Sequence, residues 1–464
     1  MRYNRLTIAV AAGLLTAAIL ALAPERAEAD DLLEIYRAAL ASDPQISAAE
    51  SAMYAAGEGI VQSRAALLPN ILGSASIGDS TTSSTQVTSI PQPDGTVRFG
   101  PATGASDTRS RNYRVVLNQS VYDHSDYTRL RAARANSSGF AARYDVALDT
   151  LFIRVADAYF NALTATTNLE AALAEEKAVK RQLDQADQRF EVGLSAITDV
   201  HEARARSDAA RAAAILSQNQ VDDAYEALVE LTGKPVGTLA PLAEEIALVR
   251  PVPDQPESWV DTARDQSPAL AVRRFELEVA RQNVETAKAG HLPRLDFSYD
   301  FTDSRSTGSR STSTFDFPAD SDFRDRGPNL VLTVPIFEGF ATQSRVRQES
   351  HNRDAATDSY EQEERAVVRS TRTLFRAVVA GISEVEARRQ AQVSANAALE
   401  ATQAGFEVGT RTIVDVLISQ QVLFQAQRDY ARARHDYLVN TLRLKQTAGI
   451  IGVSDLQLVN ALLK

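Results

Sequence analysis

The stretch RFEVGLSAITDV, residues 189–200, returns 216 positions later as GFEVGTRTIVDV, residues 405–416. Both copies keep Phe-Glu-Val-Gly, an Ile and the closing Asp-Val pair. Another landmark recurs at a similar spacing, because the Leu-Pro pair at Pro69 returns at Pro293. A repeat of this length indicates an internal duplication, so the sequence predicts two similar halves of one molecule.

The composition favours long packed helices over several compact domains, since aromatic residues are only 6% of the 464 residues. The net charge of -11 argues against a nucleic-acid partner, because binding phosphates requires a basic face. The absence of cysteine excludes disulfides and thiolate metal sites. The five histidines are scattered and no nucleophile motif stands out, so we expect no metal, no cofactor and no enzyme activity.

The N-terminus has the pattern of a secretory signal peptide. Basic residues precede the apolar run 6–23, and the small residues Ala27 and Ala29 follow it, which predicts cleavage after Ala29. An uncleaved anchor helix is the alternative, since the run comes near the length that spans a bilayer. We favour cleavage because Pro24 and the Ala-x-Ala box follow at once.

Each half has the same order of elements. Helical patterns at 31–66 and 257–290 end before a Leu-Pro pair, where proline disfavours further helix. Alternating apolar and polar residues then predict two strand pairs, at about 70–122 and 294–337. In the first pair, a Pro/Gly-rich loop at 89–107 is expected to join the strands.

The alternation in these strands fits a lipid-facing band on one side and a polar lumen on the other. A half-buried sheet in a soluble domain is the commoner reading, but the sequence offers little core to cover it. Four strands cannot close a barrel around a lumen. We therefore expect several chains to contribute strands to a shared barrel.

Two very long helical stretches follow the strands, at about 123–191 and 340–407, and neither contains a proline. At 1.5 Å per residue each would reach on the order of 100 Å. Both stop at Val-Gly, where glycine can adopt the left-handed conformation that ends a helix. Return helices are predicted at about 197–231 and 413–448, the second with apolar residues at heptad spacing.

The predicted organisation has five parts. These are a signal peptide (1–29), a first repeat (30–234), a Pro-rich linker (235–256), a second repeat (257–450) and a C-terminal tail (451–464). The fold class is mainly α, with duplicated long helical hairpins and four transmembrane strands per chain.

The two FEVG turns, the helix-Leu-Pro-strand junctions and the tail SDLQL at 454–458 together resemble the TolC family of outer-membrane efflux and secretion channels. The resemblance covers essentially all of residues 30–464. It implies a homotrimer whose shared barrel crosses the outer membrane and whose helices form a periplasmic tunnel. The implied function is a passive exit duct that docks a periplasmic adaptor and an inner-membrane ABC exporter or proton-driven pump. Its cargo would be proteins, as in type I secretion, or small molecules, as in drug efflux.

The resemblance also assigns residues to a gate and to docking tips. Asp415 would face the narrowing, and Arg411 would tie the closed state by bonding Thr198 or Asp199 of the other hairpin. Two positions depart from the family pattern: Phe406 replaces a tyrosine of the tie, and Ile418 replaces a second aspartate. The tips that would meet the adaptor are Val192, Gly193, Leu194, Val408, Gly409 and Thr410.

Simpler interpretations exist for these residues. Asp199 and Asp415 lie near helix starts, where the helix dipole favours an acid, and Gly193 and Gly409 fit ordinary turns. From another functional class, a periplasmic coiled-coil adaptor without a pore also carries helical hairpins. It predicts one hairpin, a flanking pair of lipoyl-like half-motifs and no barrel, whereas this sequence predicts two hairpins and two strand pairs.

Overall fold

The computed structural model describes residues 30–312 and 316–464, so the predicted signal peptide and its cleavage site lie outside the described residues. The chain divides into two compact units. The first contains the chain up to Ser51 together with Ala142–Ala271 and Glu361–Lys464. The second contains Ala52–Ala141 and Val272–Tyr360.

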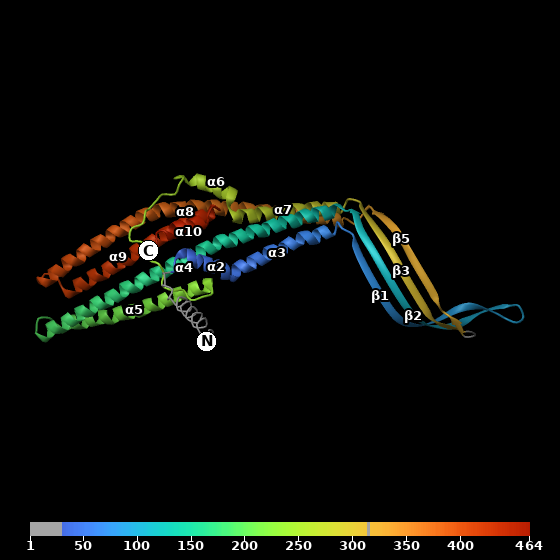
Figure 1. Ribbon diagram of the computed structural model, residues 1–464, viewed down its shortest axis with the longest axis horizontal. Helices are drawn as coiled ribbons and strands as arrows, with labels where there is room; N and C mark the ends of the chain where they lie inside the picture. The colour runs from blue at the N-terminus through green and yellow to red at the C-terminus, as the bar shows by residue number, and fades with distance from the viewer. Residues whose placement is uncertain (1–29, 313–315) are drawn as a thin grey trace, which may run out of the picture. The chain divides into compact units, whose positions relative to one another are not determined.

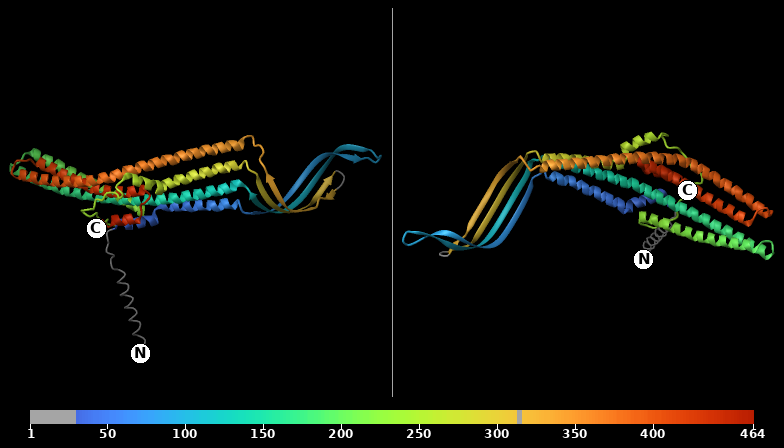
Figure 2. Two further views of the ribbon diagram at one scale, coloured as in Figure 1. Left: turned by 90° about the horizontal axis from the view of Figure 1, so that it is seen from above. Right: turned by 180° about the vertical axis from the view of Figure 1, so that it is seen from behind.

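The first unit contains most of two long helical hairpins, whose longer helices begin in the second unit with residues 124–141 and 341–360. Helix α4 (His124–Glu191) turns back into α5 (Ile197–Thr232), and α8 (Ala341–Glu407) turns back into α9 (Ile413–Thr447). Figures 1 and 2 show the two arms of each hairpin side by side. The mainly helical fold with duplicated hairpins, expected from the repeat, is confirmed.

The predicted apolar faces form the core of this unit. Tyr159 and Leu151 of α4 are fully buried, as is Leu228 of α5. On α9, Val416 and Leu444 of the heptad seam are also buried. These side chains pack because the spacing of the apolar residues keeps them on one face of each helix.

The Pro-rich linker lies against these helices. The Tyr437 hydroxyl accepts from the backbone N–H of Val249 at 2.9 Å and donates to its carbonyl at 2.8 Å. Tyr159 donates to the carbonyl of Ala240 at 2.8 Å. At the C-terminus, α10 (Val453–Asn460) precedes a bridge between Leu463 and Leu242. The linker therefore satisfies its backbone polar groups on side chains and on the tail.

The helical patterns before the strands differ from expectation, because each is two helices. They are α2 (Leu32–Ser42) with α3 (Pro44–Ala65), and α6 (Pro256–Gln266) with α7 (Pro268–Ala289). The physical reason is the internal proline, which forces the preceding residue into an extended conformation: Asp43 has ψ 118° and Ser267 has ψ 118°. Asp43 then caps α3 by accepting from the Gln45 N–H at 2.6 Å. None of the helices in the described ranges is long and apolar enough to cross a membrane.

The second unit contains one antiparallel sheet. Its long strands are β1 (Asn70–Pro91), β2 (Val97–Tyr122), β3 (Arg294–Thr312) and β5 (Ser321–Thr333), with the short β4 (Asp316–Pro318) paired to β3. β2 pairs with β3, so the predicted strand pairs from the two halves join in a single sheet.

Two boundaries differ from the sequence prediction. Most of the expected loop at 89–107 is strand, because β2 begins at Val97 and a tight turn at Gly95, with φ 83°, makes the reversal. Pro101 is tolerated there because the pairing of β2 with β3 begins only at Gly104, which leaves one strand edge unpaired. In the second pair, β5 ends at Thr333 rather than near 337.

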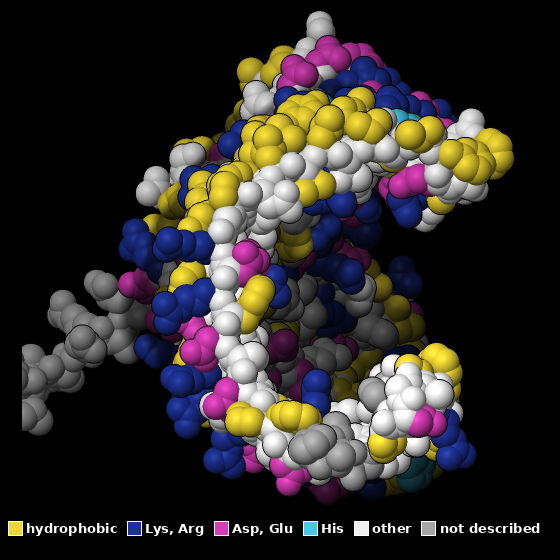
Figure 3. All heavy atoms as spheres, turned by 90° about the vertical axis from the view of Figure 1, so that its right-hand side faces the viewer, with side chains coloured by type: hydrophobic (Ala, Val, Ile, Leu, Met, Phe, Trp, Pro, Cys, Tyr) yellow, Lys and Arg dark blue, Asp and Glu magenta, His cyan; other side chains and the backbone are white. Residues whose placement is uncertain are grey.

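The two faces of the sheet differ in polarity. One face carries an apolar belt in which Leu117 lies opposite both Ile71 and Tyr299 in the register. The other face carries mainly small polar residues; Asn118, for example, lies opposite both Asn70 and Ser298. Figure 3 looks onto this end, where hydrophobic and charged side chains gather along the outer rim of a curved surface. We call the face with the apolar belt the outward face.

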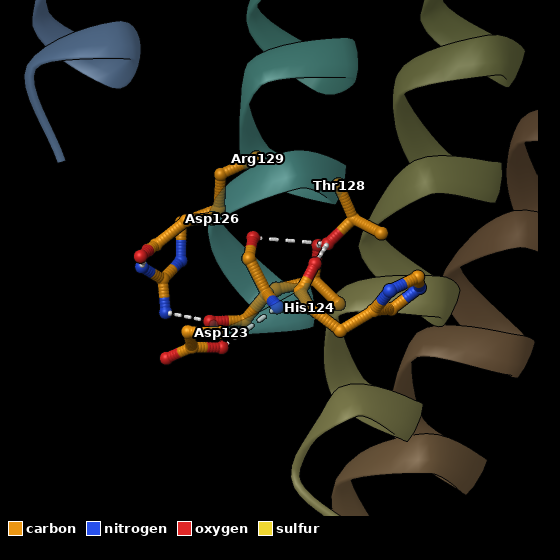
Figure 4. Close-up of polar contacts among 7 residues, drawn as sticks. Asp123, His124, Asp126, Thr128 and Arg129 are labelled. Atoms are coloured by element: carbon orange, nitrogen blue, oxygen red, sulfur yellow. Dashed lines mark hydrogen bonds and ion pairs between the residues drawn. The ribbon is translucent and has the colours of Figure 1, made fainter. Parts of the chain in front are cut away.

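A polar cluster begins α4 directly after β2 (Figure 4). Asp123 accepts from the backbone N–H two residues further along at 2.8 Å, and Arg129 pairs with Asp126 at 2.7 Å. Thr128 and Thr286 share a hydroxyl-hydroxyl hydrogen bond of 2.7 Å that joins α4 to α7. Burial, followed by the charge of Asp123, raises the pKa of Asp126.

Candidate gate at the hairpin tips

The two hairpin turns are built in the same way. Gly193 has φ 74° and Gly409 has φ 78°, a conformation that side chains other than glycine disfavour. The N–H of Leu194 bonds to the carbonyl of Arg189 at 2.7 Å, and the N–H of Thr410 bonds to that of Gly405 at 2.8 Å. These bonds close both helix ends in the manner of a Schellman motif.

The tips present apolar side chains to solvent. Val192 is 68% exposed, Leu194 is 77% exposed and Val408 is 75% exposed. A Cβ added at either turn glycine would meet nothing within 4 Å in this chain. A substitution there would therefore be strained by the backbone conformation and not by crowding.

Asp415 completes the capping box at the start of α9, in which Thr412 is the N-cap residue. Its carboxylate accepts from the Thr412 backbone N–H at 2.9 Å and from the Thr412 hydroxyl at 2.9 Å, and the Asp415 N–H donates back to that hydroxyl at 3.3 Å. These hydrogen bonds to Thr412, together with the nearby charge of Arg411, hold the pKa of Asp415 below its usual range. The carboxylate is thus ionised at neutral pH, whether it serves the cap alone or also lines a pore.

A contact that the sequence did not predict joins the two hairpins. The guanidinium of Arg189, at the end of α4, lies 4.5 Å from the centre of the Phe406 ring on α8. A cation over an aromatic face is attracted by the negative face of the ring. Phe406 is therefore contacted by an arginine from the other hairpin.

Apolar packing and a polar contact reinforce the junction of the hairpins. Ile413 and Leu417 of α9 are buried together with Val179 of α4. Further from the tips, the Arg206 guanidinium donates to the Gln421 side chain at 3.3 Å. A groove of about 610 Å³ also runs between the hairpins and includes Arg189 and Phe406 in its lining.

The predicted tie itself is not formed in this single chain. Among the described residues, Arg411 makes no hydrogen bond or ion pair with Thr198 or Asp199. Thr198 and Ile418 are exposed, whereas Asp199 is half-buried near the start of α5. Arg411 packs instead over its own turn, because a Cβ added at Gly405 would lie 2.8 Å from its Cγ.

The Arg189 contact could have been suspected from the repeat. Position 189 is arginine in the first copy and glycine, Gly405, in the second, although the neighbouring Phe-Glu-Val-Gly is unchanged. A change of this kind inside a matching segment shows that the two copies are not used in the same way. Periodicity alone gives no distance between hairpins, so the partner Phe406 could not be read from it.

Comparison with known proteins places this architecture in a family. A protein-family model described as outer membrane efflux protein matches residues 35–234 and 259–450. The outer membrane protein TolC of Vibrio cholerae is 36% identical over 438 residues, covering 94% of this chain and 94% of that protein. The alkaline protease secretion protein AprF of Pseudomonas aeruginosa is 31% identical over 447 residues, covering 96% of this chain and 89% of that protein.

Solved structures share the fold. The outer membrane protein VceC of Vibrio cholerae matches with a TM-score of 0.70 at 18% identity, covering 90% of this chain and 96% of that one. The open-state MtrE outer membrane channel of Neisseria gonorrhoeae matches with a TM-score of 0.64 at 16% identity. At these identities the match shows the fold alone, which combines long helices with a strand portion.

Proposed function

The chain belongs to the outer membrane efflux protein family, and on that premise we propose that it is the passive exit duct of a tripartite export system. It is an outer-membrane protein that extends into the periplasm. The observation that carries the proposal is the sheet of four long strands, apolar on one face and polar on the other, in a chain that also has two long hairpins. A periplasmic adaptor without a pore would have no use for such a sheet.

The working duct is a homotrimer. Four long strands are too few to enclose a lumen, so a closed wall requires strands from further chains. Three chains supply the barrel, and their hairpins continue it as a tunnel. The duct carries out no chemistry of its own, and an inner-membrane exporter or pump supplies the energy.

Assembly is tested by fractionation and native mass spectrometry of the expressed protein. We expect a trimer in the outer-membrane fraction that forms conducting pores in planar bilayers. Recovery as a soluble periplasmic monomer would end this proposal.

The exposed tips receive the periplasmic adaptor. Val192, Leu194 and Val408 offer apolar contact area there, and both turn glycines leave open space above the backbone. The cargo is a secreted protein or a small molecule, since relatives of this chain include a protease secretion protein. Restored protein secretion or restored drug resistance in a bacterium lacking its own duct distinguishes the two.

The gate closes by ties between hairpins at the tips. Asp415 from each chain forms a ring of negative charge at the narrowing, and Arg411 bonds Thr198 or Asp199 of a neighbouring hairpin. A charge-assisted hydrogen bond of this kind contributes about 1.5 to 3 kcal/mol, which a docking partner can overcome. The tie is tested by a double-mutant cycle of Arg411→Ala with Asp199→Ala in single-channel recordings; strictly additive effects on open probability would exclude it.

A further inference from the structure

The outward face of the sheet carries a cluster of arginines beyond its apolar belt. Continuing along β2 and β3 from the belt toward the strand turns, the face carries Tyr113, then Arg111 opposite Arg305, then Arg109. The neighbouring β5 adds Arg324, which lies opposite Asp303. This cluster is set apart from the small polar residues on the other face of the same strands.

Most of these arginines have a carboxylate partner. Arg109 pairs with Asp79 at 2.7 Å, and Arg324 pairs with Asp303 at 2.8 Å. Arg305 lies 3.3 Å from Asp322. Three charges on the outward face are therefore already compensated within the chain.

Two arginines of the outward face lack such a partner among the described residues. Arg326 lies opposite Phe301 of the apolar belt. Arg111 lies between Ile77 on one side and Arg305 on the other. Within the described ranges no carboxylate forms an ion pair with it, and its side chain is exposed. Arg305 lies directly opposite and has Asp322 at 3.3 Å, so the two arginines share one carboxylate and leave one positive charge uncompensated, which favours an anion at this position.

The position of the pair along the strand matches a lipid headgroup region. Ten residues separate Leu295, where the apolar belt begins, from Arg305. At about 3.3 Å per residue and a strand tilt of about 40°, these ten residues rise roughly 25 Å, the height of the apolar band of an outer-membrane barrel. Arg111 and Arg305 thus lie where the hydrocarbon ends, on the side away from the helices, with Tyr113 and the Asp303–Arg324 pair just inside.

We propose that Arg111 and Arg305 bind a phosphate group of the phosphorylated lipid in the outer leaflet. A guanidinium offers a planar pair of donors that matches two phosphate oxygens, and arginines at directly opposite positions of two strands can share one phosphate. The bound anion would compensate the positive charge that Asp322 leaves over on this pair. The lipid would therefore also stabilise the pairing of β2 with β3, which joins the two halves of the repeat.

This inference rests on the proposed duct, because it requires the outward face to meet lipid. Trimer recovery from the outer membrane tests the duct, whereas the experiment below is carried out on recovered trimers and tests the site alone. The probe is lipid A, with enzymatically dephosphorylated lipid A as its matched counterpart.

Native mass spectrometry of delipidated trimers measures bound lipid as a function of its concentration. We expect the wild-type trimer to bind lipid A at least tenfold more tightly than the dephosphorylated form. Arg111→Gln should remove most of that preference, and Arg111→Lys should keep part of it because it retains the charge without the planar fork. The control is Arg310→Gln, which removes the same charge from the opposite face of β3.

Equal binding of lipid A by the wild-type and Arg111→Gln trimers would overturn the assignment, as would a preference that does not depend on the phosphates. Inorganic phosphate that displaces lipid A at low millimolar concentration would also overturn it, because the site would then be a simple anion site. If Arg111→Gln reduces trimer recovery, Arg305→Gln and Arg111→Lys provide the same comparison.

Discussion

Removing the Arg189 guanidinium should loosen the closed gate. In Arg189→Ala the Phe406 ring loses the cation that lies 4.5 Å from its centre. A cation–π contact at an exposed site contributes about 0.5 to 1 kcal/mol. If a trimer opens all three copies together, the closed state loses about 1.5 to 3 kcal/mol, which corresponds to roughly a tenfold to hundredfold rise in the open population.

The assay is single-channel recording of purified trimers in planar bilayers, with open probability as the measured quantity. Phe406→Leu keeps an apolar side chain but removes the aromatic face, so it should raise the open probability to a similar degree. The double variant should rise no further than the larger single effect, because both changes remove the same contact.

A matched control uses Arg181, which lies on the same helix and bonds only weakly to its own backbone, at 3.4 Å to the Lys177 carbonyl. Arg181→Ala removes the same charge and should leave the open probability near that of the wild type. Additive effects of Arg189→Ala and Phe406→Leu would refute the contact, as would an equal response to the control.

Three further changes probe the gate, the tip and a half-buried carboxylate. Asp415→Asn should weaken cation selectivity, because a carboxylate ring favours cations, while the amide oxygen of asparagine can still accept from the Thr412 N–H; unchanged reversal potentials would leave Asp415 with its role in the capping box only. Gly409→Trp should abolish export while trimers persist in the outer membrane, since φ is 78° there and a bulky group would obstruct docking; normal export would exclude that tip. Burial, followed by the charge of Asp145, raises the pKa of Asp149 to about 6. Below about pH 4 the carboxyl is protonated in both the folded and the unfolded chain and does not lower the free energy of unfolding. As the pH rises toward 6 the unfolded chain ionises first, so the free energy of unfolding falls. Asp149→Asn should therefore raise the thermal unfolding temperature at pH 7.5 and leave it unchanged at pH 3.5. The raised pKa of Asp149 lowers the free energy of unfolding at neutral pH by at most about 3 kcal/mol, and by about 1 kcal/mol after allowing for solvent screening. An equal change in unfolding temperature at both pH values would contradict this prediction.

Sequence patterns within a single segment predicted where the long helices end and which of their residues are buried. The ends of α4 and α8 follow from Val-Gly, and the burial of Val416 and Leu444 follows from the heptad spacing. The same reasoning missed the break before Pro44 because a helical pattern continues on both sides of it. It also overestimated the loop at 89–107, since proline and glycine are tolerated near a strand end where one edge is unpaired.

Contacts between segments could not be predicted in this way. The stacking of Tyr36 on Phe152, with ring centres 4.4 Å apart, depends on how α2 lies against α4. The same holds for the contact between α9 and α4, in which the His435 Nδ1 lies 2.7 Å from the Thr164 hydroxyl. Burial, followed by the charge of Arg434, lowers the pKa of His435 to about 4, so a neutral imidazole joins these helices across the pH range of the periplasm.

The two copies of the repeat carry an arginine on opposite sides of the turn, and this difference bears on the contact between the hairpins. The first copy has Arg189 before its turn and Ser195 after it, whereas the second has Gly405 before and Arg411 after. An arginine at position 405 of the second copy would collide with Arg411, since a Cβ at 405 would lie 2.8 Å from the Arg411 Cγ. The glycine therefore permits Arg411 to fold over its own turn, and the cation that contacts Phe406 is Arg189 of the other hairpin. This contact between the hairpins thus depends on a position at which the two copies of the repeat differ.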